Sequence, residues 1–300
     1  MDYPRHSNVG DSAIWLGQLA LIKQAGGEPV YVCDIKSYRE SLYLRLPAQT
    51  VTVFHGGGSF GDYWPEHHAF RLGVMAADPR RDIIQMPQSI SFAKASSAEA
   101  TRQVFDRHIG NVLLGVRDRA SLERAENLCG GSVLAPDSAT YLHLRRSEPP
   151  TRAVGVLART DHERNGVDLQ ASARSAGVEV FDWVGANERL HLRVGTRISD
   201  LFPGRQYRAA IRIRDARASA NVRRGVGMLS RQEVLVTDRL HGQILATLAG
   251  VTNVAVDSGT GKLSEYYETW LAGDEIANLM PSPTEALDWA LHRDQRQPHG

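Results

Sequence analysis

The chain has 300 residues, of which 42% are hydrophobic and 23% are charged, and 35 basic and 34 acidic residues give it a formal net charge of +1. Its length suits two domains of about 150 residues with buried cores. The balanced charge excludes a chain-wide field for nucleic acid or an anionic membrane, so we expect no nucleic-acid partner. The two cysteines lack metal or disulfide spacing, which favours a reducing cytoplasm.

The first half of the chain alternates strand-like runs with helical patterns. The N-terminus reads MDYPRHSNVGD, without a basic leader, so we expect no signal peptide, and AIWLGQLALIK has the apolar spacing of an amphipathic helix too short to span a bilayer. β-Branched runs then occur at residues 29–33 (PVYVC), 50–54 (TVTVF), 82–86 (DIIQM) and 111–116 (NVLLGV). Each leads into a polar or glycine-containing loop and a segment of helical period, which predicts a parallel α/β sheet.

A second alternation follows a proline pair at residues 149–150, which interrupts both helix and central strand and predicts a linker at 147–151. Strand-like runs resume with AVGVLAR, VEVFDW, EVLVTD and TNVAVD. We therefore predict an α/β fold of two Rossmann-like domains, 1–147 and 152–282, in a GT-B-like arrangement with an interdomain cleft. Residues 283–300 are expected to form a C-terminal helix that packs back across the junction.

Two further patterns have plain structural explanations. Residues 204–232 carry many arginines, which indicates a solvated helical face or, as the alternative, a stripe that faces a ligand. His67 and His68 are adjacent in a predicted helix, so their side chains point about 100° apart, and we expect them on its surface. No metal-ligand spacing occurs among the 11 histidines, so we expect no metal site.

In open α/β sheets, ligands bind beyond the carboxyl ends of the strands, so functional residues are sought in the loops there. One such loop reads HGGGSFGDYW, directly after the run that ends at Phe54. HGGG resembles an esterase oxyanion loop, and GGSFG fits the G-x-S-x-G elbow of serine hydrolases. An elbow serine directly follows its strand, however, whereas Ser59 lies five residues past Phe54. The other interpretation is that the glycines let backbone N–H groups approach a ligand.

The segment TDRLHG predicts the start of a helix with an acid beside it. Thr237 or Asp238 is a natural N-cap, and His241 then falls in the first helical turn, near backbone N–H groups that favour anions. His241 is therefore a candidate general acid next to an anion site. The alternative is a capping aspartate with a hydrogen-bonded structural histidine.

Two cationic residues follow other predicted strands. Lys262 comes after a glycine loop that is not a Walker A motif, because positions 256 and 263 are Val and Leu. A glycine loop that presents one lysine still suits a phosphate oxygen, and the alternative is a plain surface loop. Arg117 follows the run NVLLGV, where its guanidinium suits a carboxylate or phosphate, or else pairs structurally with Asp118 or Asp137.

Taken together, the loop motifs form an ordered set. In chain order they are NVGD, GGGSFGD, PQS, VRD, PDSA, TDRLHG and the loop that contains Lys262. This set resembles the polysaccharide pyruvyl transferase family. The resemblance implies a GT-B-like fold and transfer of a pyruvyl group from phosphoenolpyruvate to two hydroxyls of one sugar, giving a cyclic ketal and phosphate. It implies no cofactor beyond this donor substrate.

The resemblance also implies roles for individual residues. His241 would be the catalytic acid, and the donor would be held by Arg117, Lys262, Arg239 and Arg159. The NVGD and glycine loops would lie opposite, on the N-terminal domain, and shape the acceptor side. The residues expected at the acceptor or in the cleft are Asn8, Gly10, Asp11, Gly56, Gly57, Gly58, Ser59, Asp62, Gln88, Ser89 and Asp137.

Other protein classes share such a fold. The main alternative is a GT-B glycosyltransferase that uses a nucleotide sugar, and a serine hydrolase and a non-catalytic scaffold are further alternatives. Members of the resembled family act in surface-polysaccharide assembly. We therefore expect a cytoplasmic enzyme, peripherally associated with the inner face of the cell membrane, whose acceptor is a glycan or a lipid-linked oligosaccharide.

Overall fold

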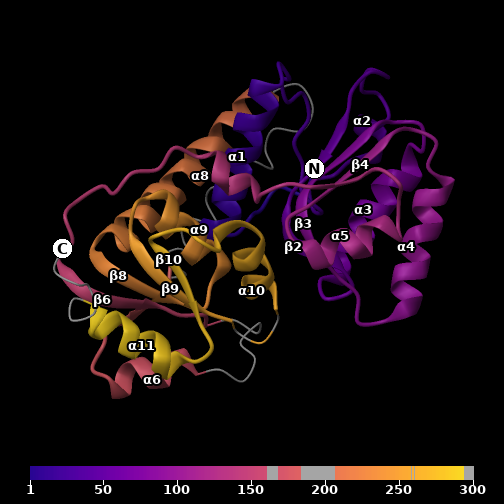
Figure 1. Cartoon of the computed structure of the whole chain (residues 1–300). Coiled ribbons are helices and arrows are strands. Elements are labelled where there is room, and N and C mark those ends of the chain that lie inside the picture. The colour runs from indigo at the N-terminus through magenta and orange to yellow at the C-terminus, as the bar shows by residue number, and fades with distance from the viewer. Residues whose placement is uncertain (161–167, 184–206, 258, 260, 294–300) are drawn as a thin grey trace. The chain divides into compact units, whose positions relative to one another are not determined.

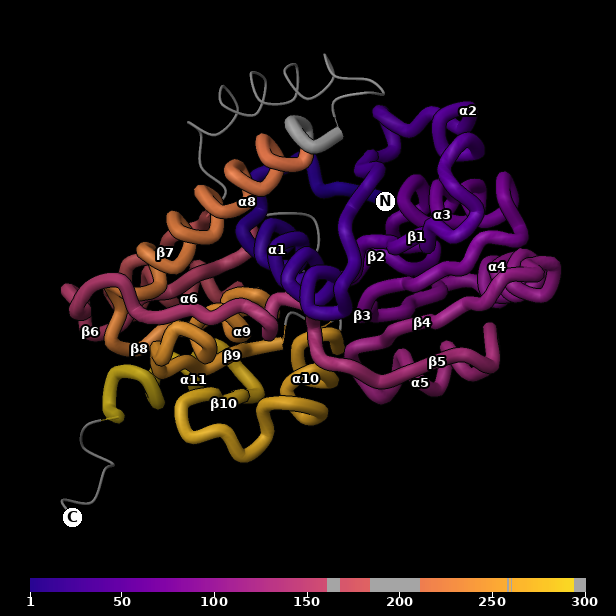
Figure 2. The backbone as a smooth tube through the Cα atoms, turned by 90° about the horizontal axis from the view of Figure 1, so that it is seen from above, coloured from indigo at the N-terminus to yellow at the C-terminus, as the bar shows by residue number. Residues whose placement is uncertain are grey.

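The computed structural model describes residues 1–160, 168–183, 207–257, 259 and 261–293. They divide into two compact units, each with its own sheet of parallel strands (Figures 1 and 2). Unit 1 contains residues 1–7, 11–141 and 207–219, and unit 2 contains the rest. The predicted α/β class with parallel strands is confirmed.

Unit 1 has the strand order β1-β3-β4-β5, and β2 also pairs with β3. Its core joins Phe54, Ile83 and Leu114 of the sheet to Met75 of α3 and Phe105 of α4. The elements are α1 (Val9–Gln24, in this unit from Asp11), α2 (Glu40–Tyr43), β1 (Thr52–Phe54), β2 (Gly57–Gly61), α3 (Pro65–Ala77), β3 (Ile83–Ser91), α4 (Ala95–Arg107), β4 (Val112–Val116), α5 (Arg119–Glu126) and β5 (Ser132–Leu134).

Local sequence signals fix two helix starts in unit 1. α3 begins with Pro65, whose fixed φ suits the first helical position and whose missing N–H costs no hydrogen bond there. α5 begins after Asp118, whose carboxylate accepts a hydrogen bond from the backbone N–H of Ser121 at 2.7 Å. The end of β4 and the start of α5 are thereby joined by a short, fixed turn that carries Arg117.

The glycine run continues the sheet instead of forming a loop. β1 pairs with the first part of β3, and β2 pairs with the last part, so one stretch of chain lies along β3. A Cβ at Gly56 would lie 2.6 Å from the carbonyl oxygen of Pro87, and Gly61 has a φ of 119°. Glycine is required at both positions, because a side chain would clash at the first and strain the backbone at the second. Residues 87–91, expected as a loop, likewise belong to β3.

Unit 2 has the strand order β10-β9-β8-β6-β7, and all of its strand pairs are parallel. The elements are β6 (Arg152–Leu157), α6 (Leu169–Ser175), β7 (Val180–Phe181), α8 (Tyr207–Ser230, in this unit from Ala220), β8 (Gln232–Thr237), α9 (Leu240–Leu248), β9 (Thr252–Val256), α10 (Lys262–Tyr266), β10 (Ala277–Met280) and α11 (Pro283–Leu291).

Helices cover both faces of the sheet in unit 2. Val156 and Val236 pack with Leu287 of α11 on one face. Leu157 alternates with Val156 along β6 and so points to the other face, where it lies against Gly242 of α9. We expected the C-terminal helix to pack back across the domain junction. α11 (Pro283–Leu291) completes the core of unit 2, because its apolar face fits the valine-rich face of this sheet, and residues 294–300 of the expected helix lie outside the described residues.

The division into two compact units differs from the predicted domain boundary. Residues 142–151 belong to unit 2, where the backbone N–H of Ser147 donates to Ser230 Oγ at 3.1 Å. Residues 8–10 also belong to unit 2, and residues 207–219, the first part of α8, belong to unit 1. The proline pair therefore lies inside unit 2 rather than between two domains.

The arginine-rich segment forms α8, and several of its arginines, including Arg214 and Arg224, donate hydrogen bonds to backbone carbonyl groups. Arg214, 4% exposed, donates to the carbonyl oxygen of Val32 at 2.7 Å within unit 1. Arg224 donates to the carbonyl oxygen of Trp183 at 2.7 Å within unit 2. The predicted solvated face is wrong at these two positions, because their guanidinium groups tie the helix to its neighbours. Residues 204–206 of this run lie outside the described residues.

The structure also differs from the sequence predictions for residues 29–33 and for His68. Residues 29–33 form no strand, although the carbonyl oxygen of Cys33 accepts a hydrogen bond from the N–H of Tyr3. His68 is buried rather than on a helix surface, with its Nε2 2.8 Å from Thr101 Oγ1, and burial lowers its pKa to about 4.

No helix in the described part of the chain is both long enough and apolar enough to cross a membrane.

Candidate functional site

Three candidate residues of unit 2 follow neighbouring strands. Arg159 comes after β6, His241 after β8 and Lys262 after β9, and these three strands are adjacent in the sheet. Because the strands are parallel, their carboxyl ends lie at one edge, where ligands of open α/β sheets bind. The structure thus brings these positions to a common edge of unit 2.

α9 begins with Arg239 at the N-cap, where the sequence predicted Thr237 or Asp238. The Thr237 hydroxyl is engaged elsewhere, since it donates to the carbonyl oxygen of Leu157 at 2.8 Å and accepts from the backbone N–H of Arg239 at 3.1 Å. An arginine side chain has no acceptor, so it does not cap the N–H groups of the first turn. These N–H groups and the positive end of the helix dipole favour an anion beside His241.

Arg239 is held by an acidic residue that sequence reasoning missed. Its Nη2 lies 2.8 Å from Oδ2 of Asp182, and the two side chains are 5% and 8% exposed. The same carboxylate oxygen accepts from Thr160 Oγ1 at 2.7 Å, and the guanidinium carbon lies 6.0 Å from the ring centre of Trp183. A cation is disfavoured at a helix N-terminus, and Asp182 offsets that cost. The sequence signal that could have identified Asp182 is its position directly after the predicted strand VEVF.

Asp238 is a buried carboxyl group at the same turn. Its Oδ1 accepts a hydrogen bond from the backbone N–H of Arg159 at 2.9 Å. Burial raises its pKa to about 6, although this hydrogen bond and the charge of Arg239 act in the opposite direction. Asp238 therefore links the ends of β6 and β8 and changes its charge in the mildly acidic range.

Lys262 is the first residue of α10 and is half-buried. Asp257 contacts the chain before and within this helix: its Oδ1 accepts from the N–H groups of Gly259 at 2.8 Å and Gly261 at 3.1 Å, while its Oδ2 accepts from that of Ser264 at 2.9 Å. Gly261 has a φ of 73°, which suits glycine at this helix start. Asp257 therefore holds Gly261 and Ser264, the residues on either side of Lys262 and Leu263.

Arg117 lies in unit 1 and is committed to an ion pair. Its Nη1 lies 2.6 Å from Oδ2 of Asp137, and the two side chains are 3% and 0% exposed. Its Nε donates to Ser89 Oγ at 2.9 Å, and Ser89 in turn donates to Asp118 at 2.7 Å. Of the two possibilities that the sequence left open for Arg117, a ligand contact and a structural ion pair, the structure shows the ion pair, with Asp137. Ser89 and Asp137, expected at the acceptor, are parts of this buried network.

Ser59 is unsuited to act as a hydrolase nucleophile. It lies within β2, and its Oγ accepts hydrogen bonds from Arg71 Nη2 at 2.6 Å and from Gln88 Nε2 at 3.4 Å. A nucleophilic serine must donate its proton to a base. A guanidinium group is a donor that stays charged, so it cannot take that proton.

Buried polar groups surround the glycine strand. His55 Nδ1 lies 3.1 Å from Gln18 Oε1, and burial lowers the pKa of His55 to about 4. Within the described residues, Gln18 Nε2, His55 Nε2 and Gln88 Oε1 have no hydrogen-bond partner. A Cβ at Gly57 would lie 3.6 Å from Gln88 Oε1 and 4.0 Å from Asp11 Oδ1. Buried polar atoms nearly always have partners, so this cluster is suited to a polar ligand or water.

Asp62, expected to contact a sugar, tethers the backbone instead. Its two carboxylate oxygens accept from the N–H groups of Ala93 at 2.7 Å and Lys94 at 3.0 Å. This joins the end of β2 to the segment that precedes α4. Gly58 lies inside β2 and is half-buried.

Asn8 and Gly10 lie in unit 2 with His241, whereas we expected them on the N-terminal domain. A Cβ at Gly10 would lie 2.6 Å from Cγ of His241. Unit 2 thus contains the candidates Asn8, Gly10, Arg159, Arg239, His241 and Lys262. Unit 1 contains Asp11, Gly56, Gly57, Gly58, Ser59, Asp62, Gln88, Ser89, Arg117 and Asp137.

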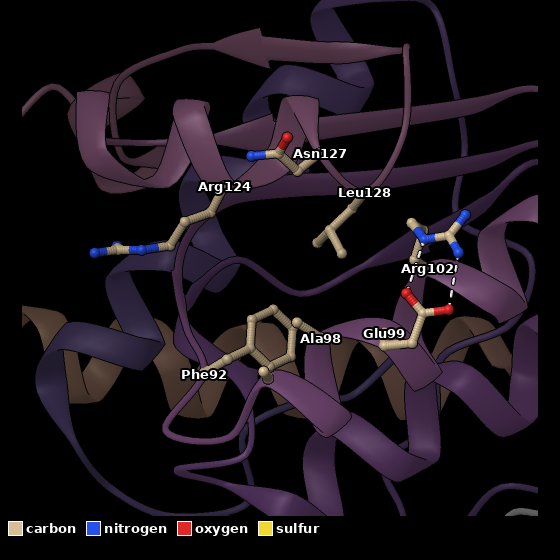
Figure 3. Close-up of a pocket in the computed structure, with 8 residues that line it drawn as sticks. Phe92, Ala98, Glu99, Arg102, Arg124, Asn127 and Leu128 are labelled. Carbon is tan, nitrogen blue, oxygen red and sulfur yellow. Dashed lines mark hydrogen bonds and ion pairs between the residues drawn. The ribbon is translucent and has the colours of Figure 1, made fainter.

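A groove of about 500 Å³ on unit 1 lies apart from these residues (Figure 3). It is lined by Phe92, by residues of α4 and α5, and by Asn127 and Leu128 just beyond α5. Glu99 and Arg102, both in α4, form an ion pair of 2.8 Å at its side. None of the candidate residues lines it. Elsewhere in the described chain, no three His, Cys, Asp or Glu side chains gather in a way that could hold a metal ion.

A family model described as polysaccharide pyruvyl transferase matches residues 8–260. The chain belongs to the polysaccharide pyruvyl transferase family. The match includes the candidate residues of both units except Lys262, which lies two positions beyond it. The resemblance drawn from the loop motifs is therefore confirmed, and the enzyme class replaces the glycosyltransferase, hydrolase and scaffold alternatives.

Individual relatives agree with this assignment. The chain is 28% identical to the putative pyruvyl transferase EpsO of Bacillus subtilis (strain 168), over 97% of this chain and 90% of that protein. It is 29% identical to pyruvyl transferase 1 of Schizosaccharomyces pombe, over 96% of this chain and 74% of that protein. A crystal structure of an uncharacterized Klebsiella pneumoniae protein matches with a TM-score of 0.62 at 19% identity, over 92% of this chain and 89% of that one, and supports the fold.

Proposed function

We propose that this polysaccharide pyruvyl transferase uses phosphoenolpyruvate as donor, forms a cyclic ketal with two hydroxyls of one sugar and releases phosphate. The observation that carries the proposal is the start of α9, where the side chain of the N-cap residue Arg239 makes no capping hydrogen bond and His241 lies in the first turn. Phosphoenolpyruvate carries both a phosphate and a carboxylate, and such groups bind at helix N-termini and to cationic side chains.

The donor is assigned to the sheet edge of unit 2. Arg159 and Lys262 supply positive charge there, and the first turn of α9, which follows Arg239, supplies N–H donors. Preorganised donors of this kind stabilise charge that develops on a leaving phosphate. Arg117 and Arg239 are not included in this donor set, because their guanidinium groups are held by Asp137 and Asp182.

His241 is assigned as the general acid. Its protonated imidazole donates a proton to the methylene carbon of phosphoenolpyruvate, which becomes a methyl group and leaves C2 electron-deficient. The oxygen of the first sugar hydroxyl bonds to C2 and gives up its proton. The C2–O bond to phosphate then breaks, phosphate leaves with the bonding pair, and the second hydroxyl adds to C2 and loses its proton. One proton replaces that donated by His241, and the other leaves with phosphate or solvent.

The acceptor is assigned to polar groups along the glycine strand of unit 1. Gln88 Oε1 is buried without a hydrogen-bond partner among the described residues, and Asp11 Oδ1 also faces Gly57. A sugar hydroxyl both donates and accepts hydrogen bonds, so it suits such groups. We further propose that the acceptor is a glycan precursor, oligomeric or lipid-linked, that is handled at the inner face of the cell membrane.

The experiment is to incubate the enzyme with phosphoenolpyruvate and a panel of free sugars, oligosaccharides and lipid-linked glycans. Phosphate release should require both substrates, and the product should gain the mass of pyruvate less one water. Release of a nucleoside diphosphate from a nucleotide sugar, without a pyruvylated product, would contradict the proposal. If only free cytosolic sugars were pyruvylated, the proposed reaction would stand, but the proposal that the acceptor is a glycan precursor would be contradicted.

A further inference from the structure

Three glycines in unit 2 allow close contacts around the start of α9. They are Gly10 in α1, Gly225 in α8 and Gly242 in α9, and a Cβ at any of them would lie under 3.0 Å from another residue. A real Cβ does not come so close to another heavy atom unless one of them is displaced. Each contact therefore fixes how the glycine backbone lies relative to the side chain packed against it. His241 lies between two of these contacts.

The first contact anchors residues 8–10. Val9 is fully buried, and a Cβ at Gly225 would lie 2.4 Å from its Cγ1. The side chain of Val9 thus fills a notch in α8 that exists because residue 225 has no side chain. Asn8 Oδ1 accepts a hydrogen bond from the backbone N–H of Gly10 at 3.1 Å, which holds Gly10 directly beyond this anchor.

The second contact places Gly10 against the ring of His241. A Cβ at Gly10 would lie 2.6 Å from Cγ, and 2.7 Å from both Cβ and Nδ1, of His241. These atoms include Cβ of His241, which is attached directly to the backbone. A rotation of the outer part of the His241 side chain therefore could not relieve the clash with an added methyl group at residue 10. The backbone of Gly10 therefore limits where the imidazole ring can lie.

The third contact fixes the backbone that carries His241. A Cβ at Gly242 would lie 2.6 Å from Thr237 Oγ1 and 2.9 Å from Leu157 Cδ2. The first turn of α9 consequently packs directly on the ends of β6 and β8. With its backbone fixed on the sheet and its ring against Gly10, the imidazole has little room to turn.

We infer that Asn8, Val9 and Gly10, anchored in the Gly225 notch, are positioning residues that hold the imidazole of His241 in the orientation needed for proton transfer. This inference rests on the proposed role of His241 as the acid. It replaces the expectation that Asn8 and Gly10 bind the acceptor. Orientation matters here because a displacement of about 1 Å in a reacting group can cost about 100-fold in rate.

The test compares Gly10→Ala and Gly225→Ala with Gly227→Ala, a matched control in α8 whose added Cβ would have Ser147 Oγ as its nearest neighbour, at 4.0 Å. Turnover should fall about 10- to 100-fold in the first two variants and stay near the wild-type value in the control. Phosphoenolpyruvate affinity, measured by calorimetry, should change little in all three. Adding Val9→Ala to Gly225→Ala removes the clashing methyl groups and should restore part of the turnover.

A second readout does not depend on the reaction. The imidazole NMR signals of His241, assigned by their loss in His241→Ala, should move in Gly10→Ala and Gly225→Ala and stay in place in Gly227→Ala. If the wild-type enzyme transfers no pyruvyl group, the proposed function fails while this readout still tests the ring position. If the Gly10 and Gly225 variants match the control in turnover and in these signals, the inference is overturned. Should Gly10→Ala not fold, Val9→Ala, which adds no atoms, must show the same signal movement.

Discussion

Arg117 and Lys262 are cations in similar sequence positions, each just after a strand, but their surroundings differ. Arg117 is 3% exposed and faces Asp137 within the network of unit 1. Lys262 is half-buried at the start of α10 in unit 2, where Asp257 accepts hydrogen bonds from Gly261 and Ser264. Position along the chain predicts that both residues lie beyond a strand, whereas the partner of each side chain depends on residues that are distant in sequence. The buried ion pair with Asp137 thus identifies Arg117 as a structural arginine.

Arg117→Ala should destabilise the fold, because it leaves the buried carboxylate of Asp137 without its partner. Breaking a buried ion pair in this way costs roughly 3 to 5 kcal/mol in free energy of unfolding. Urea unfolding followed by circular dichroism measures the loss. Arg102→Ala is the control, since Arg102 pairs with Glu99 at an exposed position of α4 and its removal should change stability little. Unchanged stability with weakened donor binding would instead restore Arg117 as a donor ligand.

Lys262→Ala should weaken binding of phosphoenolpyruvate without unfolding the protein. Loss of a charge-assisted contact to an anion costs about 2 kcal/mol, or about 30-fold in dissociation constant. Calorimetric titration measures this change. Lys23→Ala, at an exposed position in the last turn of α1, should bind the donor as the wild type does. Equal donor affinity in the Lys262 and Lys23 variants would remove Lys262 from the site.

The secondary-structure elements show where sequence patterns are sufficient and where packing decides. β-Branched runs predicted β1, β4, β8 and β9, because such residues fit a buried pleated surface. β2 was missed, since glycine has low strand propensity and this strand exists through its pairing with β3. The N-cap at Arg239 was also missed, because arginine has no capping acceptor and the alternatives, Thr237 and Asp238, are held by other partners.

The β8–α9 junction should show pH-dependent stability through Asp238. Burial raises the pKa of Asp238 to about 6, above its ordinary value near 3.8, so the stability that depends on its protonated form is complete below about pH 3.8 and is lost as pH rises through about 6. The loss by pH 8 amounts to roughly 3 kcal/mol.

Asp238→Asn isolates this effect, because it keeps an oxygen acceptor for the N–H of Arg159 and removes the charge. Relative to the wild type, the variant should gain stability in urea unfolding between pH 4.5 and pH 8. Asp106→Asn, at an exposed position in α4, should gain none over the same range. The same stability difference at both pH values for Asp238→Asn would contradict the assignment.

At the scale of the whole molecule, the repeated strand–helix alternation predicted two parallel α/β sheets, and the loop motifs predicted the family. The unit boundaries were not predictable, because residues 8–10 and 207–219 join their units through tertiary packing that leaves no local pattern. The same holds for the site. TDRLHG marked His241, but the supports from Asp182 and Gly10 come from segments distant in sequence.

Deuterium incorporation shows whether the donor is phosphoenolpyruvate and whether its methylene carbon is protonated on the enzyme. Enzyme equilibrated in D₂O is mixed with phosphoenolpyruvate and the glycan acceptor for a single turnover, and the product is analysed by mass spectrometry and NMR. One solvent-derived deuterium is expected in the methyl group of the ketal, and product formation should be slowed about 10² to 10⁴-fold in His241→Ala. A pyruvylated product whose methyl group carries no deuterium, or a His241→Ala rate near that of the wild type, would contradict it.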